Sequence, residues 1–174
     1  MSHNEVLEAI RCRRSIRSYS TQPVEEEKLD QILEAGTYAP TGRGAQSPVI
    51  VAVRQPDTIR LLSQMNAEIL GTESDPYYGA PVLVLVFADS TRSTWLQDGS
   101  CVLENMMLAA YALSLGSCWI NREKEMFETP QGKALMAQWG LAENLAGVGA
   151  LALGYPDGPQ PKAAARKAGY IIKR

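Results

Sequence analysis

Three arginines and a serine stand close together near the start of the chain, at positions 13 to 17. The guanidinium groups of Arg13, Arg14 and Arg17 present paired N–H donors that match the oxygens of a phosphate, and the Ser15 hydroxyl adds a further donor. A phosphate group is therefore the ligand that this cluster would suit. Taken alone, however, a short basic cluster is more often a solvated face of the protein, so the surrounding sequence has to decide.

A second unusual stretch is the loop at residues 40–48, which reads PTGRGAQSP. Its two prolines and two glycines are too many breakers for a helix or a strand. The Gly-Arg-Gly core is a weak phosphate-loop signal, because the Lys-Ser or Lys-Thr of a nucleoside triphosphate site does not follow it. By itself this stretch predicts a long turn-rich loop.

Hydrolytic and metal chemistry find no support in the residue types. The single histidine, His3, stands in a terminal segment, and no paired-carboxylate motif is present, so neither a triad nor an acid–base pair is predicted. Cys12, Cys101 and Cys118 are widely spaced, and we expect reduced thiols and no metal site. We therefore expect no catalytic side chain of the hydrolytic kind.

The composition is that of one ordinary domain. The 174 residues are 45% apolar and carry a net charge of -2, which predicts a single domain over residues 1–174 and argues against nucleic acid and anionic membranes as partners. No basic leader with an apolar run follows the first methionine, and no apolar run approaches the roughly 20 residues of a membrane span. We expect a cytoplasmic protein.

The apolar patterning predicts the elements that position these residues. Helices are expected, in chain order, over residues 2–12, 25–36, 59–69, 94–115 and onward from about 129. Strands are expected at residues 49–53, 82–87, 117–121 and 147–153, the first two buried on both faces at the centre of the sheet. A short apolar segment at residues 169–172 has no partner nearby in sequence and is expected to join another sheet, such as that of a partner subunit.

Five short motifs follow one another in a fixed order: RRSIRSY at 13–19, APTGRGAQSP at 39–48, GAP at 79–81, LGSCWI at 115–120 and LGYP at 153–156. In this order and spacing the chain resembles the FMN-dependent nitroreductase family over nearly its whole length. The resemblance implies an α+β fold with a mixed, mainly antiparallel central sheet flanked by helices. It also implies a homodimer that exchanges its C-terminal segments and holds FMN in two clefts at the interface.

The resemblance also assigns roles to the basic cluster. Arg13 and Ser15 match positions that hold the FMN phosphate, and Arg14 matches one that touches the phosphate and ribityl region. Arg17 matches a position that faces the N1 and O2 edge of the flavin ring, where a cation stabilises the negative charge that appears on reduction and so raises the reduction potential.

Other matched positions lie elsewhere in the chain and share an implied contact with the flavin. They are Pro40, Thr41, Gly42 and Gln46 on a loop from the other subunit, Asn66 at the pyrimidine edge, Trp119, Ile120 and Asn121 at a strand end near N5, and Arg166 with Lys167 as the phosphate contact of the tail. A second basic residue is common two positions before that arginine, where this chain has Ala164, and Lys162 is a candidate replacement.

The implied activity is that of an FMN-dependent NAD(P)H oxidoreductase. NADH or NADPH delivers hydride to flavin N5, and in a ping-pong cycle the electrons pass to a nitroaromatic, a quinone or a similar small planar acceptor. A non-catalytic FMN-binding or storage protein and a flavin-cleaving or dehalogenating enzyme of the same fold are the alternatives. The choice of nicotinamide, the acceptor and the roles of Tyr77, Tyr78 and Trp95 stay open.

Overall fold

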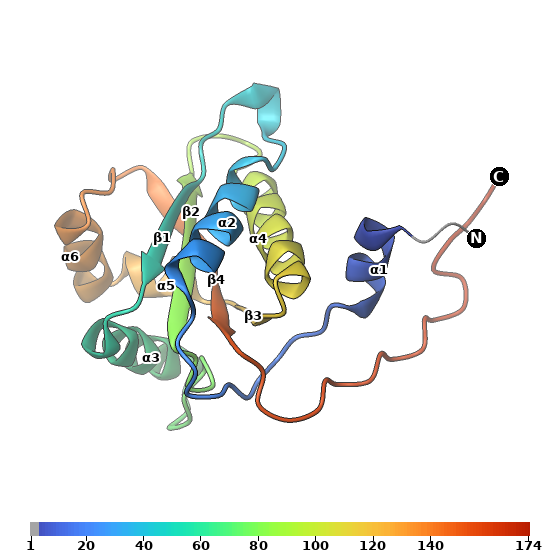
Figure 1. The fold of residues 1–174 in the computed structure, drawn as a ribbon. Helices are drawn as coiled ribbons and strands as arrows, with labels where there is room; N and C mark the ends of the chain where they lie inside the picture. Colours follow the sequence, from blue (N-terminus) through green and yellow to red (C-terminus); the bar gives the residue numbers. More distant parts are fainter. Residues whose placement is uncertain (1–3) are drawn as a thin grey trace.

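A four-stranded sheet forms the centre of residues 4–174, which are the part of the chain that the computed structural model describes (Figure 1). The strands are β1 (Val49–Val53), β2 (Val82–Asp89), β3 (Gly116–Ile120) and β4 (Leu145–Gly154), in the order β1-β2-β4-β3. All three pairs of neighbouring strands are antiparallel, which confirms the α+β fold with a mainly antiparallel sheet. Ser2, expected in the first helix, and His3 lie outside the described residues.

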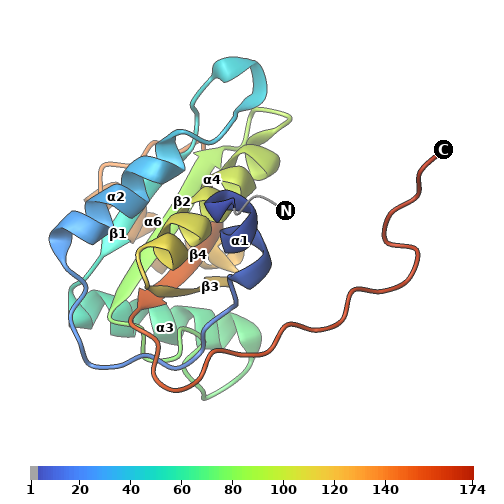
Figure 2. The ribbon, with the colours of Figure 1, turned by 45° about the vertical axis from the view of Figure 1, so that its right-hand side comes forward.

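Helices cover both faces of this sheet (Figures 1 and 2). They are α2 (Glu26–Thr37), α3 (Pro56–Leu70), α4 (Trp95–Ala112), α5 (Glu123–Glu128) and α6 (Pro130–Gln138), whereas α1 (Glu5–Cys12) stands apart from the sheet. Side chains of α2 and α4 form one buried cluster with the sheet, and side chains of α3, α5 and α6 form a second cluster on the opposite face. The sheet is thus the middle layer of three.

The sequence of the central strand β2 is a continuous apolar run with no alternation of apolar and polar residues, and its surroundings explain this. Val82, Val84 and Val86 belong to the cluster with α2 and α4, whereas Leu83 and Leu85 belong to the cluster with α3, α5 and α6. Side chains of a strand point alternately to its two faces, and here both faces are covered by helices. The buried position expected for this strand is confirmed.

One sequence expectation needs correction, and one helix was not predicted. β1 was expected at the centre of the sheet, but it is an edge strand with only Val53 fully buried and Ala52 exposed, because a strand pairs with it on one side only within residues 4–174. The helix α5 was not expected, because a stretch of six residues with charged side chains at most positions carries no clear helical period. The short segment at residues 169–172 forms no strand within the described chain.

Both ends of the chain lie away from the three layers. α1 stands beside α4, and the tail beyond Pro156 runs outward in an extended path (Figure 2). Both carry exposed apolar side chains, which are Val6, Leu7 and Ile10 on α1 and Tyr170, Ile171 and Ile172 on the tail.

A separate observation concerns all helices within residues 4–174. None of them combines the length and the apolar character needed to cross a membrane.

Candidate functional site

The basic cluster is held against the start of β3. After α1 ends at Cys12, Ser15 forms an isolated parallel bridge with Ser117, and the Ile16 N–H donates to the Ser117 carbonyl oxygen at 3.0 Å. A Cβ atom on Gly116 would lie only 2.8 Å from Cγ1 of Ile16, so a glycine is needed for this close approach. The first residues of β3 therefore fix the backbone on which the arginines stand.

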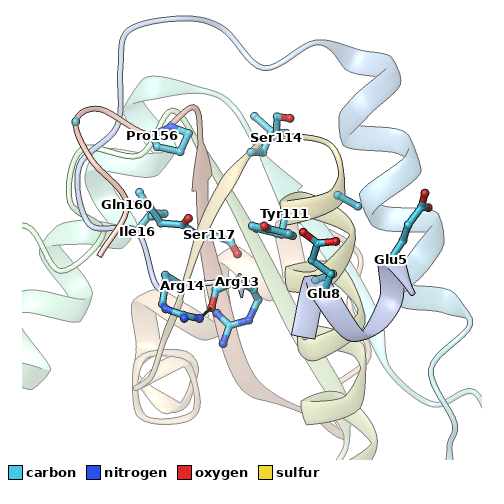
Figure 3. Close-up of a pocket in the computed structure, with 14 residues that line it drawn as sticks. Glu5, Glu8, Arg13, Arg14, Ile16, Tyr111, Ser114, Ser117, Pro156 and Gln160 are labelled. Atoms are coloured by element: carbon cyan, nitrogen blue, oxygen red, sulfur yellow. Dashed lines mark hydrogen bonds between the residues drawn. The ribbon is translucent and has the colours of Figure 1, made fainter. Parts of the chain in front are cut away.

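Arg13 and Arg14 line a cavity of about 480 Å³ next to this bridge (Figure 3). Arg14 Nη1 donates to the carbonyl oxygens of Arg11 and Arg13 at 2.8 and 2.6 Å, yet Arg14 Nε and Arg13 Nη1 are buried without a hydrogen-bond partner. Buried donors without a partner are costly, by about 1–3 kcal/mol each and more when charged. The two orphaned nitrogen atoms fit a ligand with several anionic oxygens, such as a phosphate.

Arg17 lies further along the same segment and is exposed. Its Cζ atom stands 5.9 Å from the centre of the Tyr78 ring, close enough for a cation–π interaction. Tyr78 comes from the loop between α3 and β2, so two segments remote in sequence meet here. Beneath them Cys118 is buried, and burial raises the pKa of its thiol.

Asn66 on α3 is fully buried and holds the far end of β3. Its Nδ2 donates to the Asn121 carbonyl oxygen at 3.0 Å, and its Oδ1 accepts from Arg122 Nε at 2.8 Å. Arg122 needs this support, since its φ of 85° lies in the left-handed region that few arginines adopt. The structure thus places Asn66 as the residue that fixes the Asn121 backbone, whereas its contact with a flavin stays a prediction.

A buried carboxyl group that the sequence analysis missed completes this network. The Tyr77 hydroxyl donates to Glu123 Oε1 at 3.1 Å and accepts from Asn66 Nδ2 at 3.3 Å, while Glu123 Oε2 is buried without a partner. Burial raises the pKa of Glu123 to about 8 and, together with the neighbouring carboxylate, raises that of Tyr77 well above its usual value. In the sequence Glu123 looks like any surface acid, because its partner Tyr77 is 46 positions away.

Trp119 and Ile120 contribute packing to the two layers around β3. Ile120 is buried in the cluster with α3, α5 and α6, and the half-buried Trp119 packs against the cluster with α4. The Trp119 indole lies so close to Gly149 that a Cβ atom there would be 2.4 Å from its Nε1. Within the described residues β3 is an edge strand, and Ser15 pairs with its outer edge at Ser117, so the outer backbone edge that follows Ser117 is left for a ligand.

The predicted loop at residues 40–48 lies at the opposite end of the sheet from the arginines (Figure 1). It leads into Val49, which pairs with Phe87 at the far end of β2, whereas Val82 at the near end pairs with Leu153, itself paired with Ser117. One chain therefore does not bring the loop and the arginine cluster together.

The loop is nevertheless firmly held. The Gly42 N–H donates to Asp98 Oδ1 of α4 at 2.9 Å, and Thr94 Oγ1 donates to the other oxygen of the same buried carboxylate at 3.1 Å. The Gln46 N–H donates to Thr41 Oγ1 at 2.9 Å. Thr41 and Gln46 line a second cavity, of about 410 Å³, against α2 and β1, while the adjoining Pro40 is exposed.

The predicted tail residues lie apart from the arginine cluster in the described chain. Arg166 donates to the Ala164 carbonyl oxygen, and Lys167 Nζ stands 5.3 Å from the centre of the Tyr170 ring. The side chains of Arg166 and Lys167 are exposed. The tail residue that does line the cavity is Gln160, whose Nε2 donates to the Cys12 carbonyl oxygen at 2.9 Å. A lone glutamine in a Pro- and Lys-containing stretch gives no sequence signal for that position.

Fold and site together define an α+β protein with a cavity, lined in part by Arg13 and Arg14, at one end of an antiparallel sheet. The sequence model of the Nitroreductase family matches residues 10–75 and 68–155, which is most of the chain. The chain therefore belongs to the nitroreductase family and is an oxidoreductase of that family, as the sequence motifs led us to expect.

Individual relatives agree with this assignment. An Archaeoglobus fulgidus protein with the provisional name NADH dehydrogenase/NAD(P)H nitroreductase is 32% identical over 160 residues, covering 87% of this chain and 86% of the relative. An NADPH-flavin oxidoreductase of Vibrio harveyi is 27% identical, covering 97% of this chain and 72% of its own. The crystal structure of a Bacteroides fragilis nitroreductase with bound FMN superposes with a TM-score of 0.90 at 33% identity, covering 98% of this chain and 99% of the other.

Proposed function

We propose that this chain is an FMN-dependent NAD(P)H oxidoreductase that reduces small planar acceptors such as nitroaromatics or quinones. The observation that carries the proposal is the pair of buried, unpartnered guanidinium nitrogens on Arg13 and Arg14, in a family whose structures include one with bound FMN. FMN, when bound, would take electrons from the nicotinamide and pass them to the acceptor. The chain's own residues bind, orient and tune that group.

The phosphate would lie at the arginine end of the first cavity. Arg13 and the Ser15 hydroxyl would hold its oxygens, and Arg14 would reach the phosphate and the ribityl chain. Glu5 and Glu8 line the α1 side of the same cavity (Figure 3), and their carboxylates disfavour an anion there. The phosphate is thereby directed toward β3.

The flavin ring of FMN would extend from the arginines along the outer edge of β3. Arg17 would stand beside its N1 and O2 atoms, where a fixed positive charge favours the reduced state. The backbone of residues 119–121 would border the reactive face, and Asn66 fixes this backbone through the Asn121 carbonyl oxygen. No side chain needs to act as acid or base, since solvent can supply protons on an open face.

A second copy of the chain would complete each site. The loop with Pro40, Thr41, Gly42 and Gln46 would reach the flavin bound by its partner, which accounts for its distance from the arginines of its own chain. The exposed apolar side chains of α1 and of residues 170–172 would be covered in such a dimer, with each tail laid on the partner. In that position Arg166 and Lys167 would add their charges to the phosphate contact.

The proposal is tested by an anaerobic visible absorption spectrum of the purified protein supplied with FMN. We expect the spectrum of bound flavin, bleaching on addition of NADH or NADPH, and recovery on addition of a quinone or nitroaromatic. Bound flavin that neither nicotinamide bleaches would contradict the reductase activity and favour an FMN carrier. Protein that binds no FMN would overturn the proposal as a whole.

A further inference from the structure

A tightly bonded turn at residues 75–79 precedes β2. Asp75 accepts hydrogen bonds from the Tyr77 N–H at 2.9 Å and from Ser63 Oγ at 2.6 Å through Oδ1, and from the Gly79 N–H at 2.7 Å through Oδ2. One carboxylate thus ties together both sides of the turn and the neighbouring helix α3. A turn with this many bonds leaves little freedom to the residue at its tip, which is Tyr78.

Tyr78 has an unusual backbone conformation for its residue type. Its φ of 58° lies in the left-handed region, which glycine adopts without cost but a bulky aromatic residue does not, and Gly79 follows with a φ of 69°. Such conformations persist only where the surroundings impose them. The Asp75 bonds on either side of Tyr78 are that constraint.

The preceding residue anchors the turn in the core. Tyr77 is fully buried, and its hydroxyl donates to Glu123 Oε1 at 3.1 Å. Tyr78 is therefore directed outward from a rigid base, with 39% of its surface exposed. The ring it presents lies 5.9 Å from Cζ of Arg17, the residue proposed to face the N1 and O2 edge of the flavin.

We infer that Tyr78 is a positioning residue that holds the Arg17 guanidinium in place for the flavin. An exposed arginine side chain samples many rotamers, and ordering it costs conformational entropy. A ring placed beforehand by the Asp75 turn reduces that cost, because the cation–π contact selects one position of the guanidinium. The inference rests on the proposed function, because the proposed function assigns FMN as the ligand of Arg17.

The test measures FMN affinity and midpoint potential in a double-mutant cycle of Arg17→Ala and Tyr78→Leu. We expect each single variant to bind oxidised FMN and to have a lower midpoint potential than the wild type. In Tyr78→Leu, which removes the aromatic ring, the affinity for reduced FMN should fall about two- to fivefold more than the affinity for oxidised FMN. The double variant should have the potential of Arg17→Ala alone, and Tyr78→Phe that of the wild type. Additive shifts, or a wild-type potential in Tyr78→Leu, would overturn the inference.

A second measurement needs no cofactor. Phenylglyoxal modifies accessible arginines, and peptide mass spectrometry of the apoprotein reports the rate at Arg17. We expect a severalfold faster rate in Tyr78→Leu and in Asp75→Ala, and an unchanged rate in Tyr78→Phe. The matched control is Tyr155→Leu, which removes a ring 5.0 Å from the cation of Lys28 and should not alter Arg17.

The two measurements separate this inference from the proposed function. If the wild type binds no FMN, the proposed function fails, while the labelling rates still show whether Tyr78 positions Arg17. If FMN binds but the labelling rate of Arg17 and the midpoint potential do not change when Tyr78 is replaced by leucine, only the inference fails.

Discussion

The carboxylate of Asp98 accepts a hydrogen bond from the backbone N–H of Gly42 at 2.9 Å, across 56 positions of sequence. Asp98 is buried near the start of α4, and Gly42 lies in the loop proposed to contact the partner's flavin. A side chain on Gly42 would meet Thr94, because a Cβ atom there would be 2.3 Å from Thr94 Oγ1. A helix of the core therefore sets the position of the loop.

Replacing Asp98 by alanine should release this loop. The Gly42 N–H loses its buried acceptor, so we expect the free energy of unfolding to fall by about 1–3 kcal/mol and the Gly42 amide to exchange its hydrogen at least tenfold faster. Urea unfolding and hydrogen exchange measure the two effects. Glu104→Ala, an exposed acid on the same helix, is the control, and equal exchange in both variants would contradict the anchoring role.

Replacing Arg13 by alanine should weaken FMN binding while the fold survives. A charge-assisted hydrogen bond contributes about 1.5–3 kcal/mol, so we expect the dissociation constant from fluorescence titration to rise about 10- to 100-fold. Arg11→Ala removes an exposed arginine two positions earlier and should leave the affinity as in the wild type. Full affinity in Arg13→Ala would rule out its phosphate contact.

Glu123 should make the stability of the fold depend on pH. Burial raises its pKa to about 8 from 4.5, so between these values the folded chain keeps a proton that the unfolded chain has released. The free energy of unfolding should therefore fall as the pH rises through this range, by at most about 1.4 kcal/mol per pH unit, and level off above about pH 8.

Urea unfolding between pH 5 and 9 checks this dependence. Glu123→Gln should remove the slope, whereas Glu143→Gln, at an exposed position, should retain it. A wild-type slope in the Glu123 variant would mean that another group carries the effect.

Deleting residues 169–174 should destabilise the proposed dimer. The deleted part includes Tyr170, Ile171 and Ile172, which are more than 70% exposed in the single chain and would be covered by a partner. Sedimentation equilibrium should show a weaker association, whereas Lys173→Ala within the same segment should have little effect. A truncated chain that dimerises as well as the full one would exclude the tail exchange.

The elements with a strong apolar period were predictable from the sequence, as were the motifs. The extents expected for α2, β1, β2 and β4 differ from the observed bounds by only a few residues. The bridge between Ser15 and Ser117 brings together two motifs that the sequence had linked only by family resemblance. The helices and strands could be predicted because the apolar period of each depends on residues within one short stretch of chain. The link between the two motifs could be predicted from the order of the motifs.

The remaining features depend on contacts between distant residues. Asp98, Asp75 and Glu123 look alike in the sequence, yet each is fixed by a different remote partner: Gly42, Ser63 and Tyr77. The edge position of β1 was missed because its side chains pack on both faces of the sheet, Ile50 on one face and Val51 and Val53 on the other, so its sequence is as apolar as that of a central strand. No local pattern distinguishes such cases.

The separation of the loop at residues 40–48 from the arginine cluster has a genetic consequence. If every site takes its arginines from one chain and its loop from the other, a chain with Arg13→Ala and a chain with a disrupted loop are each defective as homodimers. A mixed dimer of the two concentrates both defects in one site and leaves the other site with intact arginines and an intact loop. On co-expression of the two defective alleles, each mixed dimer should then have up to half the activity of a wild-type dimer, which is intragenic complementation.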